Sequence, residues 1–241
     1  MTIKTEDVRY SDGPLSCLGL LAYDDALSGK RPGVLIIHEG FGFGEHAVER
    51  ARMIAGLGYV AFAADLFGER FATTNMEEVM KLIGDLSGNP PKLRARAKAA
   101  LDVLAASPRA DAKKLFAMGF CFGGTTSLEL ARGGNDLRGV VSFHGGLETK
   151  APAKKGAVKA SVLVCAGADD PLVPPAQREA FEAEMREAGA DWQLIAYGNT
   201  VHSFTNPAAD GSVMPGIKYN AEADKRSWRH MKDFFEERIK G

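Results

Sequence analysis

The sequence alternates short apolar runs with stretches of helical period, and this order restricts the chain to few folds. The apolar runs are nearly continuous, as in strands of a parallel sheet that helices cover on both faces. They occupy residues 33–38, 59–65, 114–120, 139–145, 161–167 and 192–198. Stretches of helical period occupy residues 46–58, 92–107, 125–134, 176–189 and 221–240. This order predicts a mostly parallel, doubly wound α/β sheet.

The remaining segments fit one domain, residues 1–241. Residues 15–23 alternate as an edge strand would, and a chain of 241 residues that is 45% hydrophobic can form one core. Residues 68–91 are the expected excursion over the sheet, too short for a large lid domain, and residues 205–218 are expected to form a surface loop. We find no internal repeat and no long low-complexity linker.

Charge and motifs indicate a small-molecule partner. The net charge is −1, from 30 basic and 31 acidic residues without blocks of like charge, so no footprint for nucleic acid or an anionic membrane is visible. Neither a secretory signal nor a membrane span is recognisable, and we expect a cytoplasmic protein. GxGxxG and the P-loop lysine are absent, so we expect no cofactor. The oligomeric state is left open.

The three cysteines are Cys17, Cys121 and Cys165, and they do not form a CxxC pair. An odd number without that pairing predicts neither a disulfide framework nor a zinc ribbon. Cys165 lies inside an apolar run and is expected to be packed in the core. The position of Cys121, by contrast, indicates a reactive thiol.

Cys121 is the centre of GFCFGG, residues 119–124, which follows an apolar run and leads into a helix. The pattern G-x-C-x-G is typical of a nucleophile elbow, where a strained residue projects its side chain and small neighbours let strand and helix approach. The N–H groups and dipole of the helix N-terminus would stabilise a thiolate. The alternative is that Cys121 is a small buried hydrophobic residue.

Two candidate partners follow later apolar runs in the order nucleophile, acid, histidine. Asp170 follows residues 161–167, and His202 follows residues 192–198. Because ligands bind beyond the carboxyl ends of parallel strands, we expect Cys121, Asp170 and His202 to meet at one edge of the sheet. Asp169 is the rival acid. The structural alternatives are a plain turn at the acids and a solvated histidine.

The chain resembles the dienelactone hydrolase family of α/β hydrolases. The matching pieces cover nearly the whole chain in order: HEGFG (38–42), GFCFGG (119–124), SFHG (142–145), GADDPLVP (167–174), HSFTNP (202–207) and ADKRSW with a later FF near the C-terminus. The resemblance implies a single-domain α/β-hydrolase fold. It also implies that Cys121 is the nucleophile, His202 the general base and then acid, Asp170 its orienter, and Glu39 the residue that handles the cysteine proton.

Glu39 lies in HEGFGFGEH, which does not match HExxH, so we predict no metal site there. We expect burial to raise the pKa of Glu39 until it can exchange a proton with the thiol. In the family, the resting thiol turns toward this glutamate. The same loop is expected to supply one oxyanion donor, the N–H of Gly40 or Phe41, and the Phe122 N–H the other.

The substrate is expected to be a carboxylic ester or lactone. A sulfur nucleophile suits acyl groups with good leaving groups, because the tetrahedral intermediate otherwise expels the sulfur again. The family's carboxylate-binding arginine is replaced by Asn206, so a carboxylate clamp is missing there. Arg70 could meet an anionic substrate or be a solvated loop residue. Phe41 is a candidate wall of an acyl pocket.

Two other functions use the same residues. The chain could be a redox-sensing or ligand-binding α/β protein in which Cys121 reacts with oxidants and turnover is incidental. Acyl transfer to an acceptor other than water would need the same triad. Neither alternative explains the complete triad better than hydrolysis does.

Overall fold

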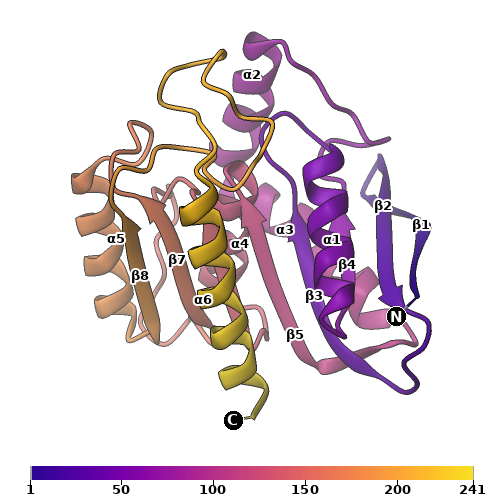
Figure 1. Ribbon diagram of the computed structural model, residues 1–241. Helices are drawn as coiled ribbons and strands as arrows, with labels where there is room; N and C mark the ends of the chain where they lie inside the picture. The colour runs from indigo at the N-terminus through magenta and orange to yellow at the C-terminus, as the bar shows by residue number, and fades with distance from the viewer. Residues whose placement is uncertain (1, 241) are drawn as a thin grey trace.

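The computed structural model describes residues 2–240, which form one eight-stranded sheet with helices on both faces (Figure 1). The strand order is β1-β2-β4-β3-β5-β6-β7-β8. β2 is antiparallel to both its neighbours, and the other pairs are parallel. The strands are β1 (Ile3–Asp12), β2 (Leu15–Asp24), β3 (Arg31–Ile37), β4 (Val60–Ala64), β5 (Ala110–Phe120), β6 (Gly139–Phe143), β7 (Ser161–Gly167) and β8 (Trp192–Tyr197).

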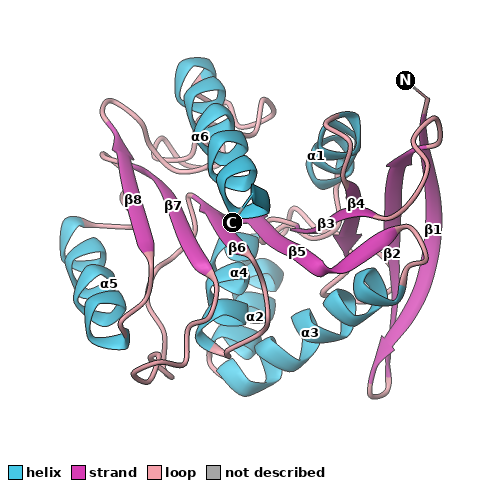
Figure 2. Ribbon diagram, turned by 90° about the horizontal axis from the view of Figure 1, so that it is seen from below, coloured by secondary structure: helices cyan, strands magenta, loops and turns pink. Residues whose placement is uncertain are grey.

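The helices form two layers and one excursion. α1 (Glu45–Gly56) and α6 (Ala221–Lys240) cover one face, and α3 (Pro90–Ala106), α4 (Phe122–Arg132) and α5 (Pro175–Ala188) cover the other (Figure 2). α2 (Met76–Ser87) and the loop before α6 lie at the edge where the arrowheads of β5 and β7 end (Figure 1). The predicted α/β-hydrolase fold class is confirmed.

The central strands are apolar on both faces because both faces are covered. In β3, Leu35 and Ile37 pack with the layer of α3, α4 and α5, whereas Val34 and Ile36 pack with the layer of α1 and α6. Alternate side chains of a strand point to opposite faces, so a strand between two helical layers must be apolar at every position.

The structure corrects the predicted sheet edge. Residues 15–23 belong to β2, and the strand at this edge of the sheet is β1, which the sequence analysis did not find. β1 reads IKTEDVRYSD and is mostly exposed, so its apolar positions are too few for a clear strand signal. The predicted excursion contains α2, whose first N–H groups are capped by Asn75. Within residues 2–240, no helix is long and apolar enough to cross a membrane.

Candidate active site

Cys121 lies between β5 and α4 in a strained backbone conformation, with φ 54° and ψ −120°. A positive φ is uncommon for a residue other than glycine and persists only where the surroundings enforce it. Here the Cys121 N–H donates to the Phe143 carbonyl and to His144 Nδ1, both at 3.0 Å. The side chain is half-buried. The turn has the form of the predicted elbow.

The glycines around Cys121 are required by close backbone approaches. A Cβ atom on Gly123 would lie 2.2 Å from the Ile37 carbonyl oxygen, and one on Gly119 would lie 2.1 Å from the Gly123 carbonyl oxygen. A Cβ atom on Gly124 would lie 2.6 Å from Ser142 Oγ. No side chain fits at these distances, so the motif allows α4 to start directly against β3 and β6.

His202 and Asp170 form a buried pair at the same edge. His202 Nδ1 lies 2.8 Å from Asp170 Oδ2, and Asp170 Oδ1 accepts the Leu172 N–H at 2.8 Å. Asp169, the rival acid, is exposed. The His202 backbone exchanges hydrogen bonds with residues 216 and 218, so the predicted surface loop also fixes the histidine.

The free nitrogen of His202 faces Cys121. Its Nε2 is buried and has no hydrogen-bond partner among residues 2–240. Burial opposes the charge of the imidazole, but the neighbouring Cys121 sulfur and then Asp170 outweigh it and raise the pKa of His202 to about 10. An imidazolium held beside a sulfur can stabilise a thiolate and later donate a proton to a leaving group.

His144 is a site residue that the sequence analysis did not single out. It is buried with φ 40°; its Nδ1 accepts the Cys121 N–H and its Nε2 lies 2.7 Å from Thr205 Oγ1. Burial, followed by the charge of His202, holds its pKa well below the ordinary value. His144 is therefore a neutral support of the elbow. Its position directly after β6, at the edge where Cys121 lies, was the available signal.

Glu39 does not have the raised pKa expected from the sequence. Burial alone favours the neutral acid, but the contacts of His46 and Asn206 outweigh it and lower the pKa of Glu39. Asn206 Nδ2 donates to Glu39 Oε2 at 2.6 Å, and His46 Nδ1 lies 3.4 Å from the same oxygen. The partners of this carboxylate are therefore nitrogens and the Ser203 hydroxyl, at 3.5 Å, and it is ionised at neutral pH.

A chain of polar contacts continues from Glu39 into the helix layer formed by α1 and α6. Arg50 Nε donates to His46 Nε2 at 3.2 Å, and Arg50 Nη2 donates to Asp224 Oδ1 at 2.7 Å and to the Thr205 carbonyl at 2.5 Å. This polar chain thus joins the loop after β3 to α1 and α6. The sequence analysis placed His46 only at a helix start, because these contacts span up to 174 residues.

The predicted oxyanion donors lie in two adjacent segments. The Phe122 N–H is the first of α4, so the helix itself offers it no acceptor. Gly40 and Phe41 lie in the turn after β3, where the Gly42 N–H donates a hydrogen bond to the Glu39 carbonyl. α2 holds this turn, since a Cβ atom on Gly40 would lie 2.6 Å from Ile83 Cδ1. His38 lies behind it and donates from Nδ1 to the Glu39 carbonyl.

Arg70 is engaged in structural bonds. Its guanidinium donates to the Leu18 and Gly19 carbonyls of β2, at 3.0 and 3.1 Å, and pairs with Asp7 of β1. It therefore ties the loop after β4 to the edge hairpin, and the structure offers no support for the substrate contact considered for it. Asn206 likewise directs its amide to Glu39.

A cavity of about 630 Å³ adjoins the Glu39 side of the site. Glu39, Phe41, His46 and Asn206 contribute to its lining, whereas Cys121 does not. Phe41 is half-buried there, in keeping with a wall of a substrate site, whereas Phe120 is fully buried in the core. The cavity is large enough for a small ester or lactone.

A mostly parallel sheet whose strand ends bring together an elbow cysteine and a buried histidine–carboxylate pair defines an α/β hydrolase. The sequence model of the dienelactone hydrolase family matches residues 19–239, and the chain belongs to this family. It is a carboxylic ester or lactone hydrolase.

Solved structures and curated relatives agree with this assignment. A structure named m3DLH is 45% identical, with a TM-score of 0.94 and coverage of 98% of this chain and 99% of that one. The dienelactone hydrolase-like promiscuous phosphotriesterase P91 from metagenomic libraries is 44% identical, with the same TM-score and coverage. A Yersinia pestis protein named "Putative carboxymethylenebutenolidase" is 27% identical over 89% of this chain and 81% of its own length.

Proposed function

We propose that this hydrolase acts through Cys121 as nucleophile, His202 as general base and acid, and Asp170 as its orienter, with a thioester intermediate. The observation that carries the proposal is the position of His202. One ring nitrogen is fixed by Asp170 at 2.8 Å, and the other is buried, unbonded within the described chain and influenced by the Cys121 sulfur. This is the arrangement that nucleophilic acyl transfer requires.

In the first half of the reaction, the Cys121 thiolate adds to the acyl carbon and the carbonyl electrons move onto oxygen. The N–H of Phe122 and an N–H of Gly40 or Phe41 stabilise this oxyanion. The intermediate collapses when the bond to the leaving alkoxide breaks. The alkoxide takes the proton of the His202 imidazolium, which leaves an acyl thioester on Cys121 and a neutral histidine.

In the second half, water attacks the thioester while the neutral His202 takes its proton. Collapse of the second tetrahedral intermediate breaks the carbon–sulfur bond and releases the carboxylic acid. The sulfur leaves as a thiolate beside the re-formed imidazolium. Because the thiolate is itself a good leaving group, acyl substrates with poor leaving groups return to reactants, which favours lactones and activated esters.

Glu39 supports this cycle as a fixed negative charge. Its carboxylate is held by Asn206 and His46, and its lowered pKa keeps it ionised. The negative charge of Glu39 and the positive charge of His202 attract each other. We therefore propose that Glu39 stabilises the imidazolium and acts on the Cys121 proton only through His202.

A second activity is cleavage of neutral phosphotriesters. It is favoured by the 44% identity to the promiscuous phosphotriesterase P91 across 98% of this chain. A thiolate and two oxyanion donors serve attack at phosphorus as well as at carbon. Asn206, uncharged, stands where a carboxylate clamp would select anions.

The test is hydrolysis of p-nitrophenyl acetate, and of paraoxon, by the wild type and its Cys121→Ala, Cys121→Ser and His202→Ala variants. We expect Cys121→Ala and His202→Ala to lower kcat/KM for the ester by about a thousandfold or more, because members of a triad act as a unit. Product release should show an initial burst if the thioester forms faster than water removes it.

The matched control is Cys17→Ala, which removes a buried thiol of β2 outside the site. It should keep the wild-type rate. Ester turnover by Cys121→Ala at the wild-type rate would refute the thioester mechanism. Loss of ester but not paraoxon turnover in that variant would refute a shared nucleophile.

A further inference from the structure

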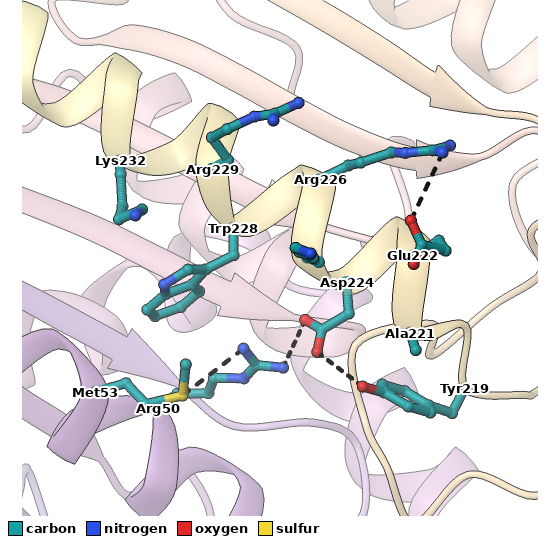
Figure 3. Close-up of a pocket in the computed structure, with 11 residues that line it drawn as sticks. Arg50, Met53, Tyr219, Ala221, Glu222, Asp224, Arg226, Trp228, Arg229 and Lys232 are labelled. Atoms are coloured by element: carbon teal, nitrogen blue, oxygen red, sulfur yellow. Dashed lines mark hydrogen bonds and ion pairs between the residues drawn. The ribbon is translucent and has the colours of Figure 1, made fainter.

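A second cavity, of about 650 Å³, lies between α1 and α6, and nothing in the proposed reaction uses it (Figure 3). Arg50 and Met53 of α1 and Trp228 and Lys232 of α6 contribute to its walls. In Figure 3, Trp228 and Lys232 extend from α6 toward the side where Arg50 and Met53 lie. Its volume is that of a site for a small organic molecule.

The cavity has an excess of positive charge. Lys225, Arg229 and Lys232 line it at helical spacings of four and three residues, so they share one side of α6. None of the three has a carboxylate within ion-pair distance in residues 2–240. Arg226, by contrast, pairs with Glu222 at 3.7 Å. The three free cations favour an anionic occupant.

Arg50 adds a buried donor that is poorly satisfied. Only 5% of its side chain is exposed, and its Nε and Nη2 have strong acceptors in His46, Asp224 and Thr205. The contact of Nη1 within the described chain is the Met53 sulfur at 3.9 Å, a weak acceptor. Buried guanidinium donors normally have oxygen partners, so Nη1 marks a place for an acceptor from outside the chain.

The cavity also has an apolar wall, which Trp228 and Met53 form. The Arg50 guanidinium covers one part of the indole at 5.1 Å from its centre, and Trp228 remains half-buried at the cavity. Met53 is 41% exposed, unusual for so apolar a side chain. A flat ring can pack on these groups while its charged substituent meets the cations.

We infer that the cavity between α1 and α6 binds a small aromatic carboxylate. The carboxylate accepts from Arg50 Nη1 and is attracted by Lys232 and Lys225, and the ring packs on Trp228 and Met53. The site is separate from Cys121, but Arg50 belongs to the polar chain that reaches Glu39 through His46. The inference does not depend on the proposed role of Cys121.

Tryptophan fluorescence tests the binding directly. The chain has two tryptophans, Trp192 and Trp228, so Trp192→Phe leaves Trp228 as the single reporter. Titration with benzoate at constant ionic strength should give a saturable change, whereas benzyl alcohol, which has the same ring without the charge, should bind at least about tenfold more weakly. Calorimetry on the wild-type chain should give the same dissociation constant.

Variants separate this site from a general charge effect. Lys232→Gln and Lys225→Gln should each weaken benzoate binding by about tenfold, near the value of one charge-assisted hydrogen bond. Arg52→Gln removes a cation of α1 that does not line the cavity and should leave binding unchanged. Cys121→Ser should also bind normally, so failure of the proposed mechanism and failure of this site give different results.

Several results would overturn the inference. They are a fluorescence change that does not saturate, equal binding of benzyl alcohol and benzoate, or equal binding by Lys232→Gln, Lys225→Gln and the wild type. A loss of binding in Arg52→Gln as large as in Lys232→Gln would show a diffuse charge effect in place of a site.

Discussion

At the scale of single residues, His202 is the group on which the proposed chemistry depends. It is buried, yet its pKa is raised because the Cys121 sulfur and Asp170 both favour its charged form. His144, 5.2 Å away between ring centres, has the opposite shift and remains neutral. Two neighbouring histidines thus differ in charge because only one has anionic partners.

This difference predicts a titration shift. In Cys121→Ala the pKa of His202 should fall, because the largest favourable influence on its charge is removed while Asp170 remains. Imidazole NMR signals followed against pH measure it. His144→Phe, which deletes the neutral ring, identifies the signal that should stay unshifted in Cys121→Ala. An unchanged His202 titration would contradict the Cys121 contact.

The same shift predicts a pH dependence of stability. The pKa of His202 is higher in the folded state, about 10, than its ordinary value of about 6.5. The contribution of His202 to the free energy of unfolding is therefore fully present below about pH 6.5 and is lost as the pH rises through about 10. Urea unfolding of the wild type and His202→Gln between these limits should show the advantage of the wild type decreasing.

At the scale of elements, the turn from β5 into α4 was predictable because its constraint is local. Gly119, Cys121 and Gly123 lie within five consecutive residues and create the elbow themselves. Asp170 and His202 were predictable because each follows one of two neighbouring parallel strands, β7 and β8, that end at the same side of the sheet. The contacts of His46 with Glu39 and Arg50 were not predictable, since they depend on how α1 packs against a distant loop.

Two other elements were missed for physical reasons. β1 has mostly polar residues, so its sequence shows no strand pattern. It is a strand because it pairs with β2 in the folded chain. α2 lies in the predicted excursion, and just two of its side chains, Val79 and Leu86, are buried, so its helical period is weak. The raised pKa expected for Glu39 was wrong because sequence revealed its burial but not the nitrogens around its carboxylate.

Paired glycine substitutions test the elbow as an element. Gly123→Ala should destabilise the chain by about 3 kcal/mol or more and remove ester turnover, because the new Cβ meets the Ile37 carbonyl at 2.2 Å. Gly84→Ala, inside α2 with open space around it, should stabilise it by about 0.5–1 kcal/mol. Chemical denaturation measures both; equal effects would show that the close approach does not matter.

At the scale of the whole molecule, the strand order places the site between two halves of the sheet. Cys121, His144, Asp170 and His202 follow the strands β5 to β8, whereas Glu39 follows β3. The edge hairpin of β1 and β2 lies beyond β4 and contributes none of these residues (Figure 2). It is joined to the edge that carries the candidate site by Arg70, which bonds the loop after β4 to both strands of the hairpin.

Arg70 is therefore expected to affect stability more than specificity. Arg70→Gln should cost about 1–3 kcal/mol, because it leaves two β2 carbonyls and Asp7 without a cation. The ratio of kcat/KM for a neutral and a carboxylate-bearing ester should stay the same. Arg9→Gln, which breaks an exposed pair with Glu69, should cost less than about 1 kcal/mol. A changed substrate ratio in Arg70→Gln would instead support the contact of Arg70 with an anionic substrate.

The backbone of Cys121 also limits how this enzyme can diversify. A residue with φ 54° and ψ −120° tolerates an unbranched Cβ far better than a branched one. Serine could replace the cysteine in one mutational step without altering the chain path, but threonine, an equally good alcohol, would strain it. For the nucleophile proposed at this position, sulfur and oxygen thus remain interchangeable in evolution, whereas the backbone geometry disfavours the branched side chain of threonine.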